Sequence, residues 1–137
     1  ISAIGLAAEN ITKNLNENIT QLTGLTKYLI DSLNENNIKF HINGKDRVPG
    51  ILNISFPKIS GQILMINLDL HGIAVSYGAA CSSGTPKPPK VLLETGLSTN
   101  LAKSSIRISF GKDNTKQEID YFVNSLISIL SKELKSV

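Results

Sequence analysis

The sequence predicts an α/β fold in which helices pack against a small sheet. Apolar residues recur at steps of three and four near both ends of the chain, which is the spacing of amphipathic helices. Short segments between them alternate apolar and polar residues, as half-buried strands do. The predicted order is helix, strand, strand, helix, strand, two short helices, strand and helix. With 137 residues, 41% of them hydrophobic, the chain is long enough for one ordinary core.

A single long helix is predicted over residues 1–35, ending at Asn36-Asn37. At 1.5 Å per residue it would extend about 50 Å, which is longer than a small domain needs. We therefore expect a connecting helix whose first part packs on a large domain outside this sequence, and a chain that is a fragment. The apolar or small stripe of this helix consists of Ile4, Ala8, Ile11, Leu15, Ile19, Leu22, Leu25, Leu29 and Leu33.

Two strands and a helix are expected next. The segment "IKFHIN" reads as a short strand, and turn residues follow it at positions 43–46. In "GILNISFP" the alternation points Leu52, Ile54 and Phe56 inward and Asn53 and Ser55 outward. A helix is then expected from about residue 62 to residue 70, with Ser60 as a possible N-cap and Gly72 just past its end.

The second half of the chain continues the same alternation. "IAVSYG" is predicted as a strand, and short helices are expected around 90–94 and within "STNLAKSS". "SIRISFG" is predicted as a strand, followed by a helix that opens with Thr115 and Glu118 at capping-box spacing. The apolar stripe of that last helix consists of Ile119, Phe122, Leu126, Leu130 and Leu134.

Charge and cysteine usage exclude several classes of protein. The formal net charge is +3, and the 14 basic residues are scattered, which argues against a nucleic-acid surface. No apolar run approaches the roughly 20 residues of a membrane span. We therefore expect no membrane association. One cysteine forms no internal disulfide, so nothing requires an oxidising compartment, and we expect a cytoplasmic protein.

That cysteine, Cys81, lies in "SYGAACSSGTPKPP". Small residues on both sides leave the sulfur uncrowded, and we expect a mobile loop over about 78–88 that exposes the thiol. Exposure suits a nucleophile, whereas structural free cysteines usually sit in apolar surroundings. A nucleophilic thiol also needs a base, and the chain's two histidines, His41 and His71, are not close to Cys81 in the sequence. The residues alone therefore favour a bystander thiol over a catalytic one. These residues show no metal-ligand spacing, and we expect no metal.

Arg107 is the second candidate site residue. In "SSIRISFG" it shares one strand face with Ser109, while Ile106, Ile108 and Phe110 share the other, so it is expected to point away from the core. Its planar guanidinium suits a carboxylate ligand such as an amino acid. The pattern alone favours a surface arginine paired with a nearby acid.

Taken together, "GIAVSYGAACSSG", "KVLLETGL" and "LAKSSIRISFGKDNTKQEID" resemble the C-terminal part of a cysteine desulfurase, a pyridoxal-phosphate (PLP) enzyme of the class-V aminotransferase superfamily. "ISAIGLAAE" and "VPGILNISFP" resemble further family segments, so the likeness covers nearly the whole chain. It implies the small C-terminal domain of a fold type I PLP-dependent transferase at 36–137. The long cysteine loop resembles that of the desulfurases of iron–sulfur cluster assembly.

The resemblance also implies a mechanism. PLP serves as electron sink, the thiolate matching Cys81 attacks the sulfur of L-cysteine, and L-alanine and an enzyme persulfide result. Arg107 matches the arginine that holds the substrate carboxylate. A mobile loop would carry the sulfur to an acceptor or scaffold protein, for iron–sulfur cluster assembly or for thiolation, and the full-length enzyme would be a homodimer.

The sequence lacks one part of the family pattern. The PLP lysine and its neighbouring histidine lie upstream of this chain in the family, and neither Lys87 nor Lys90 has that context. We therefore expect no cofactor-binding residue here, no bound PLP and no turnover by the isolated chain. Two alternatives stay open. Another class-V aminotransferase or lyase would use Arg107 without the thiol, and a non-enzymatic sulfur carrier would use Cys81 alone.

Overall fold

The computed structural model describes residues 2–78 and 88–133 and shows a three-stranded antiparallel sheet in the order β1-β2-β3. Strand β2 is central, with Ile54 opposite both Ile42 of β1 and Ile106 of β3. The elements are α1 (Ser2–Glu35), β1 (His41–Asn43), β2 (Ile51–Ser55), α2 (Gly61–Leu70), α3 (Lys90–Glu94), α4 (Thr99–Lys103), β3 (Ser105–Ser109) and α5 (Lys116–Glu133).

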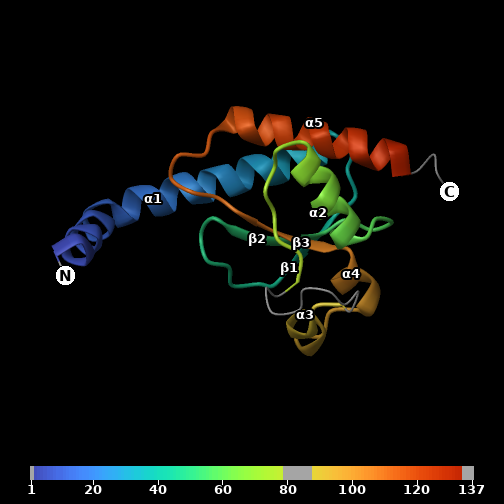
Figure 1. The fold of residues 1–137 in the computed structure, drawn as a ribbon, viewed down its shortest axis with the longest axis horizontal. Helices are drawn as coiled ribbons and strands as arrows, with labels where there is room; N and C mark the ends of the chain where they lie inside the picture. Colours follow the sequence, from blue (N-terminus) through green and yellow to red (C-terminus); the bar gives the residue numbers. More distant parts are fainter. Residues whose placement is uncertain (1, 79–87, 134–137) are drawn as a thin grey trace.

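Helices cover the sheet unequally. Figure 1 shows α1 and α5 side by side along one face, with α2 beside them, while α3 and α4 lie on the other side. The inner face carries the apolar residues of the strands, so the core forms between sheet and long helices. Its buried members are Leu25, Leu29, Leu33, Leu52, Ile54, Phe56, Ile59, Leu64, Leu68, Ile106, Ile108, Ile119, Phe122, Val123, Leu126 and Ile129.

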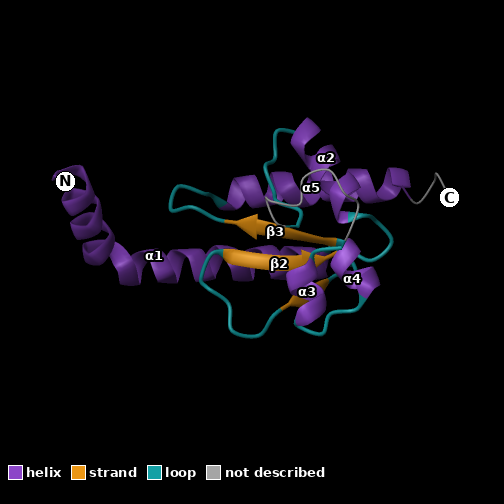
Figure 2. Ribbon diagram, turned by 60° about the horizontal axis from the view of Figure 1, so that its bottom comes forward, coloured by secondary structure: helices purple, strands orange, loops and turns teal. Residues whose placement is uncertain are grey.

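Helix α1 confirms the long predicted helix, but only its C-terminal half packs on the sheet. Leu25, Leu29 and Leu33 are buried there. The apolar residues of the first half remain open, with Ile4 76% and Leu15 47% exposed. Figures 1 and 2 show this half extending beyond the strands and α5. The same stripe therefore has one buried and one exposed half.

The predicted capping box at the start of α5 is confirmed. The backbone N–H of Thr115 donates to Glu118 Oε2 at 2.8 Å, and the backbone N–H of Glu118 donates to Thr115 Oγ1 at 3.3 Å. This reciprocal pair satisfies amides that have no partner inside the helix. Helix α2 also begins where expected, but the Ser60 side chain makes no cap hydrogen bond.

Two strand predictions are wrong in extent. The segment "IKFHIN" forms a strand only at His41–Asn43, since residues 38–40 are still leaving the end of α1. "IAVSYG" forms no strand and pairs with β3 through a single bridge at Ser76. The chain turns at Gly78, whose φ is +68°, so the pairing does not continue beyond this residue.

The outward face of β2 also differs from the prediction. Asn53 is half-buried, and Ser55 is fully buried rather than exposed. The Ser55 hydroxyl donates to the carbonyl of Leu101 in α4 at 2.8 Å, so α4 covers this end of the polar face. Alternation marks which side of a strand is apolar but does not show what covers the polar side.

None of the helices in the described ranges combines the length and the apolarity needed to cross a membrane.

Candidate functional site

Arg107 lies at the middle of β3, on the sheet face away from the core, as predicted. Side chains two apart on a strand share a face, so Ser105 and Ser109 flank it. Ser105 is buried, and its hydroxyl donates to the carbonyl of Ala102 in α4 at 2.8 Å, whereas Ser109 is exposed. Arg107 therefore stands where the cover of α4 ends and the polar face opens to solvent.

Ser76 is the direct neighbour of Arg107 on the outer edge of the sheet. The Arg107 N–H donates to the Ser76 carbonyl at 2.7 Å, and the Ser76 N–H donates to the Arg107 carbonyl at 3.0 Å. The Arg107 Nη2 group also donates to Ser76 Oγ at 3.2 Å. Three hydrogen bonds thus join the two residues. Sequence reasoning missed Ser76, although it stands five residues before Cys81.

Asparagine side chains continue the polar row across the sheet. Asn53 of β2 is opposite Arg107. Asn43 of β1 is opposite Asn53 and donates from Nδ2 to Asn53 Oδ1 at 2.6 Å and to Ser55 Oγ at 2.8 Å. Asn43 is buried, and its Oδ1 has no hydrogen-bond partner among the described residues. The polar face is therefore an ordered amide and hydroxyl surface that leads to the guanidinium.

The segment that carries Cys81 is attached beside Arg107, although Cys81 itself lies outside the described residues. Before the segment, the Tyr77 ring packs against Gly61, and this partial burial raises the pKa of the phenol above its ordinary value of 10.0. After it, Pro89 is buried as the N-cap of α3. A Cβ placed on Gly78 would lie 3.9 Å from Pro89 Cγ, so both ends of the segment meet at one place.

The histidines do not join this site. His71 Nδ1 is 2.7 Å from the Asn67 carbonyl in α2, and His41 is exposed on β1. No group of three His, Cys, Asp or Glu side chains within residues 2–78 and 88–133 comes close enough to hold a metal ion. The described lysines all lie at exposed positions.

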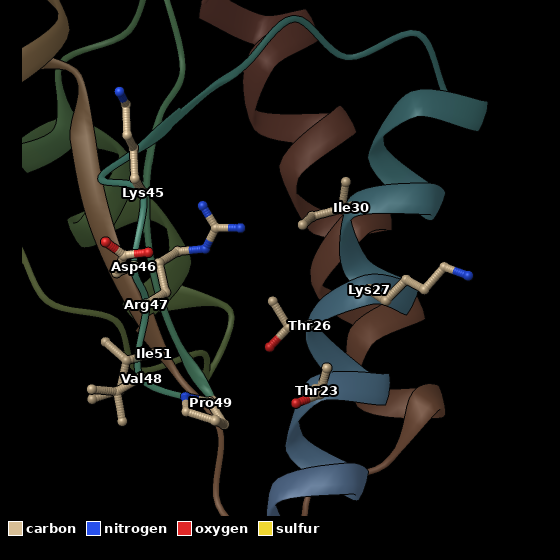
Figure 3. Close-up of a pocket in the computed structure, with 11 residues that line it drawn as sticks. Thr23, Thr26, Lys27, Ile30, Lys45, Asp46, Arg47, Val48, Pro49 and Ile51 are labelled. Carbon is tan, nitrogen blue, oxygen red and sulfur yellow. The ribbon is translucent and has the colours of Figure 1, made fainter.

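A separate groove of about 760 Å³ lies between α1 and residues 45–51. Figure 3 shows Thr23, Thr26 and Ile30 facing this loop from α1, while Lys27 points away from it. Neither Arg107 nor Ser76 lines the groove. Arg107, the predicted site residue that lies within the described ranges, stands instead on the polar face of β3.

Comparison with known proteins identifies the family. The model of the aminotransferase class-V family matches residues 1–122. The chain is 33% identical to the cysteine desulfurase IscS of Dictyoglomus turgidum over 134 residues, which is 96% of this chain and 34% of that protein. It is 36% identical to the cysteine desulfurase IscS of Clostridium botulinum strain Hall over 136 residues, again 96% of this chain and 34% of the relative.

Solved structures agree with the sequence comparison. A NifS-like protein from Rickettsia africae has a TM-score of 0.77 and 32% identity, over 93% of this chain and 33% of its own. Another NifS-like protein has a TM-score of 0.75 and 31% identity, over 90% of this chain and 31% of its own. The chain spans about a third of the length of the proteins it matches. The fold and the sequence together place this chain in the class-V aminotransferase family, in the part that corresponds to one third of a cysteine desulfurase.

Proposed function

We propose that this chain is the C-terminal part of a cysteine desulfurase that converts L-cysteine to L-alanine and leaves a persulfide on Cys81. The observation that carries the proposal is the position of Arg107. Its guanidinium stands on the open polar face of the sheet and forms no ion pair with a described carboxylate, and its side-chain hydrogen-bond partner is Ser76. The Cys81 segment begins directly beside it.

The role proposed for Arg107 is to hold the substrate carboxylate. The described ion pairs of the chain are Lys13–Glu9, Lys90–Glu94 and Lys112–Asp113, so no described acid neutralises Arg107. A guanidinium offers five N–H donors in a rigid fork and binds a carboxylate through two of them. This arrangement argues against the surface ion pair that the sequence pattern alone favours.

The role proposed for Cys81 is nucleophilic attack on the substrate sulfur. Five residues of chain span at most about 18 Å, which limits the distance from the Cα of Ser76 to that of Cys81. In the proposed step, the thiolate forms an S–S bond and the C–S bond of the substrate breaks. The carbon takes up a proton to become the methyl group of alanine. The carbon is reduced and the sulfurs are oxidised, so no external oxidant is needed.

PLP is the cofactor that the family implies, but the described residues do not fit its attachment. A lysine that forms a Schiff base is usually desolvated in a pocket, which lowers its pKa. The described lysines are all exposed, so none of them sits in the desolvated setting that a Schiff-base lysine needs. PLP acts as an electron sink in enzymes of this kind. We place the residues that hold it outside this chain, and we expect the 137-residue chain alone to form no alanine.

The test uses the longer protein that contains this chain, supplied with PLP and L-cysteine. We expect equal amounts of alanine and of added sulfur on the Cys81 peptide in a single turnover, measured by amino-acid analysis and mass spectrometry. The Cys81→Ala variant should keep its circular dichroism spectrum and lose the added sulfur entirely, because alanine offers no nucleophile. Transfer to an acceptor protein would be detected as the loss of that sulfur from the Cys81 peptide.

Other outcomes would point elsewhere. Amino-group transfer without added sulfur would identify another class-V aminotransferase. A Cys81→Ala variant that still delivers sulfide at the parental rate would refute the role of the thiol. Sulfur that reaches Cys81 only from a second protein, without alanine formation, would identify a sulfur carrier.

A further inference from the structure

We propose that Ser76 is a positioning residue that orients the Arg107 guanidinium for the substrate carboxylate. This inference rests on the proposed function, and it adds a residue that acts through Arg107. It starts from the hydrogen bond between Arg107 Nη2 and Ser76 Oγ, at 3.2 Å. No other side-chain hydrogen bond joins Arg107 to any residue in the described ranges.

The backbone places the two side chains together. Ser76 and Arg107 exchange both of their N–H···O bonds, at 2.7 and 3.0 Å, which makes them a hydrogen-bonded antiparallel pair. Residues in such a pair have Cα atoms about 5.5 Å apart and side chains on the same face. Whatever residue stands at position 76 must therefore lie beside the arginine. A short hydroxyl at this place accepts an N–H without covering the outer edge of the guanidinium.

The single bond leaves the binding edge of the arginine open. Ser76 takes one N–H of Nη2, and four of the five guanidinium donors remain. A carboxylate bound through two parallel N–H groups needs the guanidinium plane in one orientation. An arginine on an open sheet face otherwise samples several rotamers, and the loss of this side-chain entropy opposes binding. The hydroxyl of Ser76 supplies part of that order before the substrate arrives.

The support behind Ser76 is rigid on both sides. The next residue, Tyr77, packs on Gly61 of α2, which is itself buried. On the far side of Arg107, Asn53 is fixed by the amide of Asn43. The hydroxyl that orients the arginine is thus held at the start of the Cys81 segment. One short piece of chain fixes both the carboxylate-binding group and the point from which the thiol segment departs.

The first experiment measures kcat and KM for L-cysteine in the longer protein with PLP bound. Ser76→Ala should raise KM about tenfold and change kcat by less than about twofold, because the carboxylate contact is made equally in substrate and transition state. Ser76→Thr keeps the hydroxyl and should restore KM to within about twofold of the parent. Ser109→Ala is the matched control, since Ser109 shares the face and its exposed side chain makes no hydrogen bond to a described residue.

The second measurement needs no activity. Arg47 and Arg107 are the two arginines of the chain, so 15N-arginine labelling of the 137-residue chain gives two Nε–H signals, which Arg107→Lys assigns. In Ser76→Ala, the order parameter of Arg107 should fall while that of Arg47 stays constant. An Arg107 signal that is equally ordered in both proteins would overturn the inference.

The kinetic outcomes separate this inference from the proposed function. No alanine from the parent protein would overturn both. An active parent whose KM is unchanged by Arg107→Lys would remove the carboxylate role of Arg107 and with it that of Ser76. If Arg107→Lys raises KM and Ser76→Ala does not, the function stands and the positioning role is wrong. A Ser76→Ala variant with a lower kcat, a higher KM and a lower melting temperature together would show a merely structural residue.

Discussion

Three residues of β3 show how one sheet face is divided at the level of single side chains. Ser105, Arg107 and Ser109 point the same way, but α4 buries only the first. A charged residue under α4 would require a partner for its desolvated charge, whereas a serine satisfies itself on the Ala102 carbonyl. The arginine is therefore at the first position of this face where a charge stays solvated and still borders ordered chain.

Gly61 is the residue on which the placement of Tyr77 depends. A Cβ at this position would overlap the Ser105 carbonyl oxygen and lie 2.8 Å from Tyr77 Cδ2. We expect Gly61→Ala to lower the free energy of unfolding by about 3 kcal/mol, because the neighbour is backbone and has no room to move. Urea unfolding of the 137-residue chain, followed by circular dichroism, measures this change.

Gly24 provides the matched control for that substitution. It lies inside α1, and nothing stands within 4 Å of a Cβ built on it. Gly24→Ala should therefore stabilise the chain by about 0.5–1 kcal/mol, since alanine loses less backbone entropy in a helix. Equal destabilisation by both substitutions would show that the close approach at Gly61 does not limit the packing.

At the scale of the element, the capping box makes the stability of α5 depend on pH. The backbone N–H of Thr115 and the side chain of Asn114 hold the pKa of Glu118 below its ordinary value of 4.5. A lowered folded-state pKa adds stability above pH 4.5, and this stability is lost as the pH falls through the folded-state pKa. Because Glu118 is exposed, the effect is small.

The Glu118→Gln variant tests this dependence. It should be less stable than the parent at pH 7, and the difference should shrink below pH 4.5, where the parent carboxylate also becomes neutral. Thermal melting of both proteins between pH 3 and pH 7 provides the measurement. Lys116→Gln lies in the same first turn and serves as a charge control. Its difference in stability from the parent should not shrink below pH 4.5. Parallel curves for Glu118→Gln and the parent would contradict the assignment.

At the scale of the whole molecule, α1 divides into a part that belongs to this domain and a part that we propose packs on another. Leu33 is fully buried against the sheet and Leu15 is 47% exposed, although both lie on one stripe. In the 137-residue chain, Leu33→Ala should cost about 3 kcal/mol and Leu15→Ala at most about 0.5 kcal/mol, measured by urea unfolding. The two identical substitutions in one helix are each other's control.

The same two substitutions also test whether the first half of α1 packs on the proposed large domain. In the longer protein, Leu15→Ala should cost about 2 kcal/mol or more, because the stripe would then be covered and the substitution would leave a cavity. A cost that stays near zero in both proteins would show that this half of α1 faces solvent and that residues 1–35 do not connect two domains.

The sequence by itself determined the elements that depend on local chemistry. The 3.6-residue spacing of the apolar stripes gave α1 and α5, the Thr115–Glu118 pair gave the start of α5, and alternation gave the inward faces of β2 and β3. These features need only neighbours along the chain. The family likeness, carried by the cysteine and arginine motifs, also came from the sequence and is confirmed.

Tertiary structure decided what lies over each face. Ser55 alternates as an exposed residue would, yet α4 buries it, and "IAVSYG" alternates as a strand would, yet pairs only at Ser76. The contact between Ser76 and Arg107 joins residues 31 positions apart. No local spacing encodes such a pair, because it depends on which edge of the sheet the chain returns to after α2. That return is set by the packing of the core, and it places the serine beside the arginine.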